Sequence, residues 1–157
     1  AVGHNYLPDY FEAIEKLLAP DGIVVMQTIT APESRYRATK NGADFINTII
    51  FPGGCCPSLQ AMMEAMEAKS NLHLERLDNI NLHYAETLRR WRKRFNSQLP
   101  CALELGFDDC FIRCWNYYLC YCETGFEQQV MNTLILTFSR PGNQNLIADR
   151  DLGVIVN

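Results

Sequence analysis

The sequence predicts an α/β fold in which about three strands alternate with helices. A helical apolar pattern over residues 7–19 leads through a Pro-Asp-Gly turn into the run Ile23–Ile29, which is short, β-branched and almost continuously apolar. Such a run is typical of a strand buried on both faces of a sheet. Strand patterns also cover residues 72–80 and 130–139, each after helical segments. This order indicates an incomplete three-layer α/β unit.

The first helix and its turn follow from residue type. The apolar residues that recur at helical spacing are Tyr10, Phe11, Ile14, Leu17 and Leu18. Pro8 is tolerated in a first helical turn, and the sequence Pro-Asp-Gly at 20–22 ends the helix and turns the chain. Helix, tight turn and buried strand together make half of a βαβ crossover.

Between the first two strands, the pattern predicts loops and short helices. Residues 30–41 are polar and predict a surface loop, whereas residues 43–50 predict a short helix. The segment Phe51–Leu59 contains two glycines, two prolines and the pair Cys55-Cys56, so it predicts a loop. It is either a plain connector or a functional loop. Ser58 is suited to cap a helix that runs to about residue 69.

The second half of the chain is richer in helix. Residues 72–80 alternate as a strand does, with a slip at Leu77. Residues 84–95 predict an amphipathic helix whose apolar line is surrounded by arginine and lysine. This basic surface is either a solvated face or one attracted to an anionic membrane surface. Residues 98–105 predict a loop or one short turn.

The longest helical pattern, over residues 108–128, is densely aromatic. Apolar residues lie nearly all round its middle part, so it is either buried in the core or lines an apolar cavity. The strand 130–139 follows and ends at a Pro-Gly sequence. We expect one domain over residues 1–141, and the pattern assigns no structure to the tail, residues 142–157.

Composition excludes several classes of protein. Apolar residues make up 48% and charged residues 20% of the 157 residues, as in ordinary globular proteins. The net charge of -4 gives no basic excess for nucleic-acid binding. No apolar run approaches the roughly 20 residues that cross a bilayer, and no signal-peptide pattern opens the chain. Phosphate-binding glycine loops, a nucleophile elbow and a zinc-protease motif are also missing.

Seven cysteines is a high and odd number. Without a signal sequence, this argues against a secreted disulfide framework, and the spacing of the cysteines does not favour a zinc site. We expect most of them to be reduced and buried as small apolar residues. A Cys–His nucleophile pair stays open, because such partners meet only in space.

Several blocks of sequence resemble the C-terminal part of a class I S-adenosylmethionine-dependent methyltransferase. They are residues 1–3, 10–11, 18–22 and 27–29. Further blocks narrow the resemblance to the cyclopropane-fatty-acyl-phospholipid synthase and mycolic acid cyclopropane synthase family, and they cover 50–54, 57–59, 83–88, 91, 94–95, 115–119 and 122–126. The match runs in order from residue 1 to about residue 141.

This resemblance implies that a methyl(ene) group passes from S-adenosylmethionine to a cis double bond of a phospholipid acyl chain, forming a cyclopropane fatty acid. Family members also hold a bicarbonate ion beside the reacting carbons. The resemblance implies that a glutamate bicarbonate ligand and the cofactor-binding segments lie upstream of Ala1. We therefore expect no cofactor-binding residue and no metal ligand in this chain.

The resemblance also assigns site residues. Tyr84 matches a tyrosine that hydrogen-bonds the bicarbonate, and Ile29 approaches the ion through its backbone. Gln27 stands where bacterial members have histidine and plant-type members have glutamine. Cys122 matches a cysteine at the site or is a structural helix cysteine. The residues implied to line the acyl-chain tunnel are Trp115, Tyr117, Tyr118 and Tyr121.

The implied fold is Rossmann-like, with about the last three strands of a class I methyltransferase sheet and helical insertions. In that topology the final strand, 130–139, runs antiparallel between the other two. The implied enzyme acts on lipid at a membrane surface, is cytoplasmic and peripheral to the membrane, and can form homo-oligomers. The alternative is an inactive truncated paralogue that acts as a lipid- or protein-binding fragment.

Overall fold

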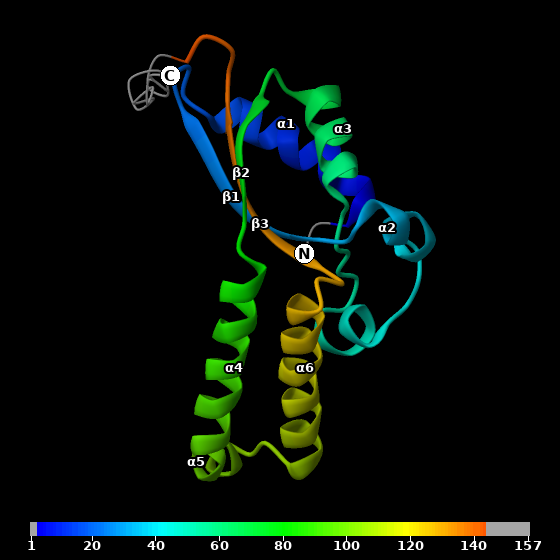
Figure 1. Cartoon of the computed structure of the whole chain (residues 1–157), viewed down its shortest axis with the longest axis vertical. Coiled ribbons are helices and arrows are strands. Elements are labelled where there is room, and N and C mark those ends of the chain that lie inside the picture. Colours follow the sequence, from blue (N-terminus) through cyan, green and yellow to red (C-terminus); the bar gives the residue numbers. More distant parts are fainter. Residues whose placement is uncertain (1–2, 144–157) are drawn as a thin grey trace, which may run out of the picture.

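The computed structural model describes residues 3–143 and contains one three-stranded sheet (Figure 1). Its strands are β1 (Ile23–Thr30), β2 (His73–Asn79) and β3 (Asn132–Ser139). The strand order is β1-β3-β2, and β3 pairs antiparallel with both neighbours. This confirms the α/β class and the predicted position of the last strand between the other two.

The main core lies between one face of the sheet and two helices, α1 (Leu7–Leu17) and α3 (Leu59–Lys69). The side chains of Phe11, Leu136 and Phe138 are completely buried there. The rings of Phe11 and Phe138 meet edge to face, with their centroids 5.9 Å apart. The apolar side chains of α1 and β3, which the sequence patterns indicated, thus pack together in one apolar layer.

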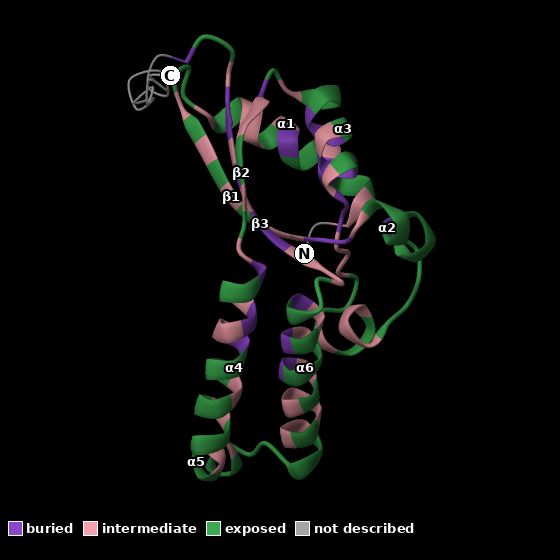
Figure 2. Cartoon of the chain, in the orientation of Figure 1, coloured by how far each residue is buried: buried purple, intermediate pink, exposed green. Residues whose placement is uncertain are grey.

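The opposite face of β1 is open. Val24 and Met26 pack on the core, whereas Ile23, Gln27 and Val25 alternate with them and are exposed, Val25 by 65% (Figure 2). The prediction that this strand is buried on both faces is therefore wrong for the described residues, because α1 and α3 cover only one face of the sheet.

The slip in the pattern of the second strand is a β-bulge. Leu74 pairs with Phe138 and Arg76 pairs with Thr137, so Glu75 is an extra residue in β2. A bulge shifts the register by one residue, and after it every side chain changes face. This places Leu77 opposite Leu136, as its departure from simple alternation requires.

Two long helices and a short one form a hairpin that projects from the sheet (Figure 1). They are α4 (Asn81–Ser97), α5 (Leu99–Glu104) and α6 (Asp109–Glu127). The two long helices confirm the predictions for 84–95 and 108–128. The expectation of a loop or one short turn over 98–105 is wrong, because Pro100 lies in the first turn of α5, where its missing amide costs nothing.

The polar segment after β1 is also helical. The helix α2 (Glu33–Thr39) begins directly after Pro32, so the predicted loop over 30–41 is wrong there. Tyr36 is 5% exposed and packs with Ala31 and Ala61. This tertiary contact stabilises a helix that the polar sequence does not indicate.

The short helix predicted over 43–50 is the π-helix η2 (Ile46–Ile50), and a 3-10 turn, η1 (His4–Tyr6), precedes α1. The segment after η2 is a loop, as predicted, and Gly53 adopts φ +77° in it. Ser58 caps α3, accepting a hydrogen bond of 3.2 Å from the amide of Ala61.

All seven cysteines lie in the described part of the chain and are free thiols. Cys101, Cys110 and Cys120 are exposed and the other four are partly exposed, so the expectation that most cysteines are buried is wrong. Within residues 3–143 no helix has the length and hydropathy to cross a membrane, and no cluster of three possible metal-ligating side chains occurs. Asn143 donates to the carbonyls of Asp21 and Gly22, and the remainder of the predicted tail lies outside the described residues.

Candidate functional site

Three predicted site residues meet where the hairpin joins the sheet. Tyr84 on α4, Cys122 on α6 and Ile29 at the end of β1 all pack against one small cluster. Its buried members are Ala85, Leu88, Leu119 and Phe126. The ring of Tyr84 lies edge to face on Phe126, with the centroids 4.9 Å apart. We call this group the Tyr84 cluster.

Burial keeps the hydroxyl and thiol groups of the Tyr84 cluster neutral. It raises the pKa of Tyr84, and the neighbouring Cys122 raises it further. Burial also raises the pKa of Cys122 to about 12 and that of Tyr118 to about 12. Desolvation disfavours an anion in each case, so at neutral pH these groups can donate protons in hydrogen bonds but cannot act as bases.

The loop 51–59 packs against this site, in line with the resemblance, which implies that Pro52, Gly53 and Gly54 fold a substrate-covering insertion over it. The ring of Phe51 lies 5.9 Å from that of Tyr118, edge to face. Burial, together with the neighbouring Cys55 and Asp44, raises the pKa of Cys56 to about 11. Cys56 and Asp44 also raise the pKa of Cys122. Sequence reasoning missed Asp44 and Cys56 because only the tertiary fold brings them near Cys122.

Gln27 is not part of the Tyr84 cluster. It lies two residues before Ile29 on the same face of β1, opposite Ile135 of β3, and its side chain is exposed. Two residues along a strand span about 6–7 Å. The glutamine amide is therefore near the site on an open face of the sheet, and its role as an anion ligand stays a prediction.

The four tryptophan and tyrosine residues expected to line one tunnel fall into two groups. Trp115 and Tyr118 pack against the Tyr84 cluster, with their ring centroids 5.0 Å apart. Tyr117 and Tyr121 are 55% and 48% exposed and contact Phe45 instead, at 4.9 and 6.4 Å. The structure thus brings only Trp115 and Tyr118 to the predicted catalytic residues.

Trp115 and Tyr118 end a continuous row of rings along α6. Phe107 stacks on Phe111 with a centroid distance of 4.3 Å, and Phe111 stacks on Trp115 at 5.7 Å. Tyr118 follows at the Tyr84 cluster. This aromatic row, defined by Phe107, Phe111, Trp115 and Tyr118, connects the tip of the hairpin with the candidate site.

A buried carboxylate joins the two long helices beside the site. Glu123 is 7% exposed and accepts hydrogen bonds from Arg89 at 2.9 Å and Arg92 at 3.0 Å. Arg90 pairs with Glu86 at 2.8 Å. Three of the basic residues on α4 are thus bound by carboxylates of the same hairpin. This favours a structural role for these three charges over attraction to a membrane.

A buried hydroxyl beside Ile29 has no hydrogen-bond partner among the described residues. Thr133 is completely buried and pairs in register with Ile29, and its Oγ1 is unsatisfied. Its amide donates to the side chain of Asn81, which is also buried and which donates to the carbonyl of Met131 at 2.9 Å. The hydroxyl of Thr133 is thus a hydrogen-bonding group without a partner within residues 3–143, on the same face of the sheet as Ile29.

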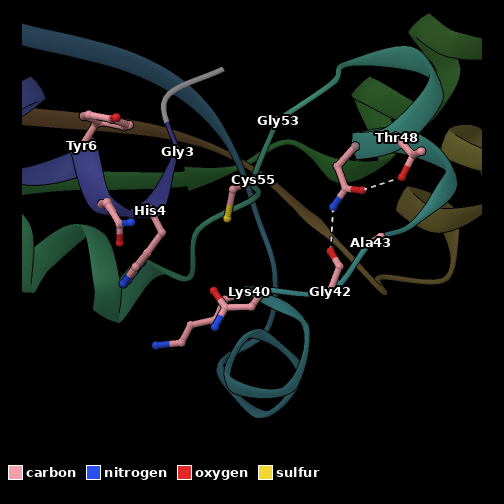
Figure 3. A pocket seen from close by; sticks show the side chains of 13 residues that line it. Gly3, His4, Tyr6, Lys40, Gly42, Ala43, Thr48, Gly53 and Cys55 are labelled. Atoms are coloured by element: carbon pink, nitrogen blue, oxygen red, sulfur yellow. Dashed lines mark hydrogen bonds between the residues drawn. The ribbon is translucent and has the colours of Figure 1, made fainter.

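A wide pocket of about 550 Å³ lies on the other side of the loop 51–59 (Figure 3). His4, Lys40 and Thr48 face it, and Cys55 forms part of its wall. The imidazole of His4 is hydrogen-bonded to the hydroxyl of Tyr36. The lining contains polar and apolar surface in about equal parts, so this pocket suits an alkyl chain less well than the aromatic row does.

Comparison with known proteins identifies the family of this chain. The family model for mycolic acid cyclopropane synthetase matches residues 1–136. The chain belongs to that family. Tuberculostearic acid methyltransferase UfaA1 of Mycobacterium tuberculosis is 40% identical over 142 residues, which are 90% of this chain and 33% of that protein. Cyclopropane-fatty-acyl-phospholipid synthase of Escherichia coli is 29% identical over 139 residues, 88% of this chain and 35% of that protein.

Solved structures of the cyclopropane synthases agree with this assignment. The cyclopropane synthase MmaA2 of Mycobacterium tuberculosis has a TM-score of 0.76 and 26% identity, over 88% of this chain and 51% of that one. CmaA1 complexed with SAH and CTAB has a TM-score of 0.75 and 25% identity, over 87% of this chain and 50% of that one. The chain is thus part of an enzyme family of S-adenosylmethionine-dependent methyltransferases, and it spans about a third to a half of the length of these relatives.

Proposed function

We propose that the protein transfers a methyl(ene) group from S-adenosylmethionine to a cis double bond of a phospholipid acyl chain, at a cytoplasmic membrane surface. The observation that carries this proposal is the meeting of Tyr84, Ile29 and Cys122 at the inner end of an aromatic row. Family membership and the E. coli relative's name, a cyclopropane-fatty-acyl-phospholipid synthase, support the reaction type and the lipid substrate.

The chemistry sets what the site must provide. S-adenosylmethionine, when bound, would supply an electrophilic methyl group on sulfur. The π electrons of the alkene form the new carbon–carbon bond while the carbon–sulfur bond breaks, which leaves a carbocation on the acyl chain. Loss of a proton from the added methyl group then closes the three-membered ring. The site must therefore stabilise a cation and accept one proton.

The Tyr84 cluster matches these requirements. Tyr84 keeps its proton and can donate a hydrogen bond to a bicarbonate held beside the cation, and we infer that the backbone of Ile29 approaches the same ion. Gln27 can donate to the same ion from the adjacent part of β1 but cannot change its charge. Because the pKa of Cys122 is raised to about 12, its thiol acts as a donor or as apolar packing and not as the base.

The aromatic residues suit the acyl chain. Rings offer an apolar surface to an alkyl chain, and their faces attract a cationic intermediate. We infer that Trp115 and Tyr118 contact the reacting carbons, and their packing against the Tyr84 cluster supports this. Tyr117 and Tyr121 contribute from the other side of α6, beside Phe45. Relatives named a methyltransferase and a cyclopropane synthase both match this chain, so analysis of the product decides between a cyclopropane and a methyl branch.

The experiment compares the natural protein that carries this chain with its Tyr84→Phe variant. Each is incubated with methyl-labelled S-adenosylmethionine and vesicles of a cis-monounsaturated phospholipid, and the fatty acids are analysed by gas chromatography and mass spectrometry. We expect a labelled product with one added carbon, and a rate about 10–100-fold lower for Tyr84→Phe. Tyr10→Phe, an exposed tyrosine on α1, is the matched control and should keep the normal rate.

The absence of any labelled acyl product from the natural protein would contradict the proposal. Binding of lipid without transfer would instead support an inactive, lipid-binding paralogue. Equal rates for Tyr84→Phe and the natural protein would contradict the role of the tyrosine, even if transfer occurred.

A further inference from the structure

The tip of the helical hairpin exposes large apolar side chains. Leu103 is 51% exposed, Leu105 73% and Phe107 43%, within five consecutive residues. Figures 1 and 2 show this tip at the end of the molecule away from the sheet, with its surface exposed. The tip therefore presents apolar surface that no described segment of the chain covers.

The backbone of the tip has its hydrogen bonds already made. Gly106, with φ +91°, donates to the carbonyl of Leu103 at 2.9 Å, and Phe107 donates to Ala102 at 3.1 Å. This pair of bonds is a Schellman motif, which satisfies the last carbonyls of a helix and requires the left-handed conformation of glycine. If the tip moved from water into an apolar environment, the amides of Gly106 and Phe107 would keep their hydrogen-bond acceptors. Their transfer would therefore not leave unpaired donors.

The aromatic row begins at this tip. Phe107 is its outermost ring, and Phe111 and Trp115 continue it towards the Tyr84 cluster. An apolar surface at one end of the row and the candidate acyl site at the other form one continuous apolar path. This continuity indicates that whatever covers the tip is also the source of the acyl chain.

The charged residues around the tip are compatible with a tip that enters a lipid surface only to the depth of the headgroups. Lys93 and Arg94 near the end of α4, and Arg113 near the start of α6, form no ion pair within residues 3–143. Glu104, Asp108 and Asp109 lie beside the leucines, and Asp108 caps α6 by accepting from the amide of Phe111. These acidic groups would have to stay at the level of the lipid headgroups, while the three basic groups can meet phosphate there.

We propose that the tip defined by Leu103, Leu105 and Phe107 inserts into the interfacial region of a phospholipid bilayer and delivers the acyl chain to the aromatic row. This inference rests on the proposed function for the identity of the substrate. The leucines and Phe107 supply the apolar contact, and Lys93, Arg94 and Arg113 supply a modest preference for anionic lipid. A second copy of the chain or another protein on the tip would be the competing occupant.

The test is co-flotation of the protein with phosphatidylcholine vesicles, with and without phosphatidylglycerol. The variant Leu103→Gln/Leu105→Gln changes only exposed side chains, so circular dichroism should show the native helix content. We expect its partition onto both kinds of vesicle to fall about tenfold or more. The matched control is Leu17→Gln/Leu82→Gln, whose leucines are 86% and 65% exposed elsewhere, and it should bind as the natural protein does.

Equal vesicle binding by the tip variant and the natural protein would overturn the inference, as would an equal loss in the control. A lower mass in sedimentation for the tip variant, with unchanged vesicle binding, would assign the tip to a second copy and also overturn it. Methyl transfer separates the two proposals. The tip variant should lose transfer from vesicles but keep transfer from detergent-dispersed substrate. Tyr84→Phe should bind vesicles normally and transfer about 10–100-fold more slowly from both substrates. If no form transfers methyl groups while vesicle binding still depends on the tip, the proposed function fails and the membrane contact stands.

Discussion

The sheet region and the helical hairpin bury their residues by different means. The sheet packs against α1 and α3 through completely buried Phe11, Leu136 and Phe138, in a core cluster of apolar side chains. The hairpin has a smaller buried cluster, and it adds the Glu123 ion pairs, the aromatic row and several half-buried hydroxyl and thiol groups. In the sheet region the large apolar side chains of the core are buried, whereas at the tip of the hairpin Leu103, Leu105 and Phe107 are exposed.

This difference assigns most of the stability to the sheet region and most of the candidate reactive groups to the hairpin. A close-packed apolar layer stabilises the fold strongly but offers no group that can donate a proton or hold an ion. The hairpin carries Tyr84, Cys122 and the exposed tip, and each of these costs some stability because polar groups are buried or apolar groups are left in water. We expect mutations in the two regions to have effects of different kind and size.

The largest effect should come from the sheet core. Phe138→Ala removes a completely buried ring that packs on Phe11, and it should lower the free energy of unfolding by about 3–5 kcal/mol. Urea denaturation followed by circular dichroism measures this loss. The control Leu17→Ala, at an 86% exposed position of α1, should change stability by less than about 0.5 kcal/mol. Equal losses for both variants would show that this layer is not the main core.

The next largest effect should be a dependence of stability on pH, which comes from Cys122 on α6 and Cys56 in the loop 51–59. The pKa values of Cys122, about 12, and Cys56, about 11, lie above the ordinary thiol value of 9.0, so the native thiols keep protons that the unfolded chain releases. The stability they contribute is fully present below about pH 9 and is lost as pH rises through about 11–12. Allowing for screening by solvent, we expect a loss of about 2 kcal/mol between pH 7 and pH 10.5.

Urea midpoints at these two pH values check this expectation. Cys122→Ala should make the decline shallower, whereas Cys120→Ala, at an exposed thiol two residues earlier, should leave it unchanged. A decline as steep in Cys122→Ala as in the natural protein would assign the pH dependence to other groups.

The ion pairs of the hairpin should contribute less than its packing does. Glu123→Gln keeps the size of the side chain but removes the charge that accepts from Arg89 and Arg92, and it should cost about 1.5 kcal/mol. The cost should shrink in high salt, because both arginines are partly exposed. Thermal unfolding at low and high salt measures it, with the exposed Glu104→Gln as control. A cost that does not depend on salt would mean that hydrogen bonding, and not charge, joins the helices.

The smallest effects compare helix caps in the two regions. Ser58→Ala removes a buried cap of α3 and should cost about 1 kcal/mol, whereas Asp108→Ala removes an exposed cap of α6 and should cost about 0.5 kcal/mol. Chemical denaturation of both variants measures the two losses in the free energy of unfolding. A larger loss for Asp108→Ala would reverse our view that the sheet region dominates stability.

Much of the secondary structure could be predicted from the sequence, because periodicity and capping residues are local signals. The strand after the Pro-Asp-Gly turn, the cap at Ser58 and the slip at Leu77 all correspond to features of the structure. The helices α2 and α5 could not be predicted. For α2 the deciding contact is the burial of Tyr36 against Ala31 and Ala61, and such a contact has no local signature.

The candidate site divides in the same way. The sequence motifs that resemble the cyclopropane synthase family determined the choice of Tyr84, Ile29 and Cys122. Only the tertiary structure decided that these three residues meet, that Gln27 stays on the open face of β1, and that Asp44 and Cys56 act on the pKa of Cys122. The physical reason is that motifs and periodicity specify which residues share a helix or a strand, whereas burial and electrostatics depend on elements far apart in the chain.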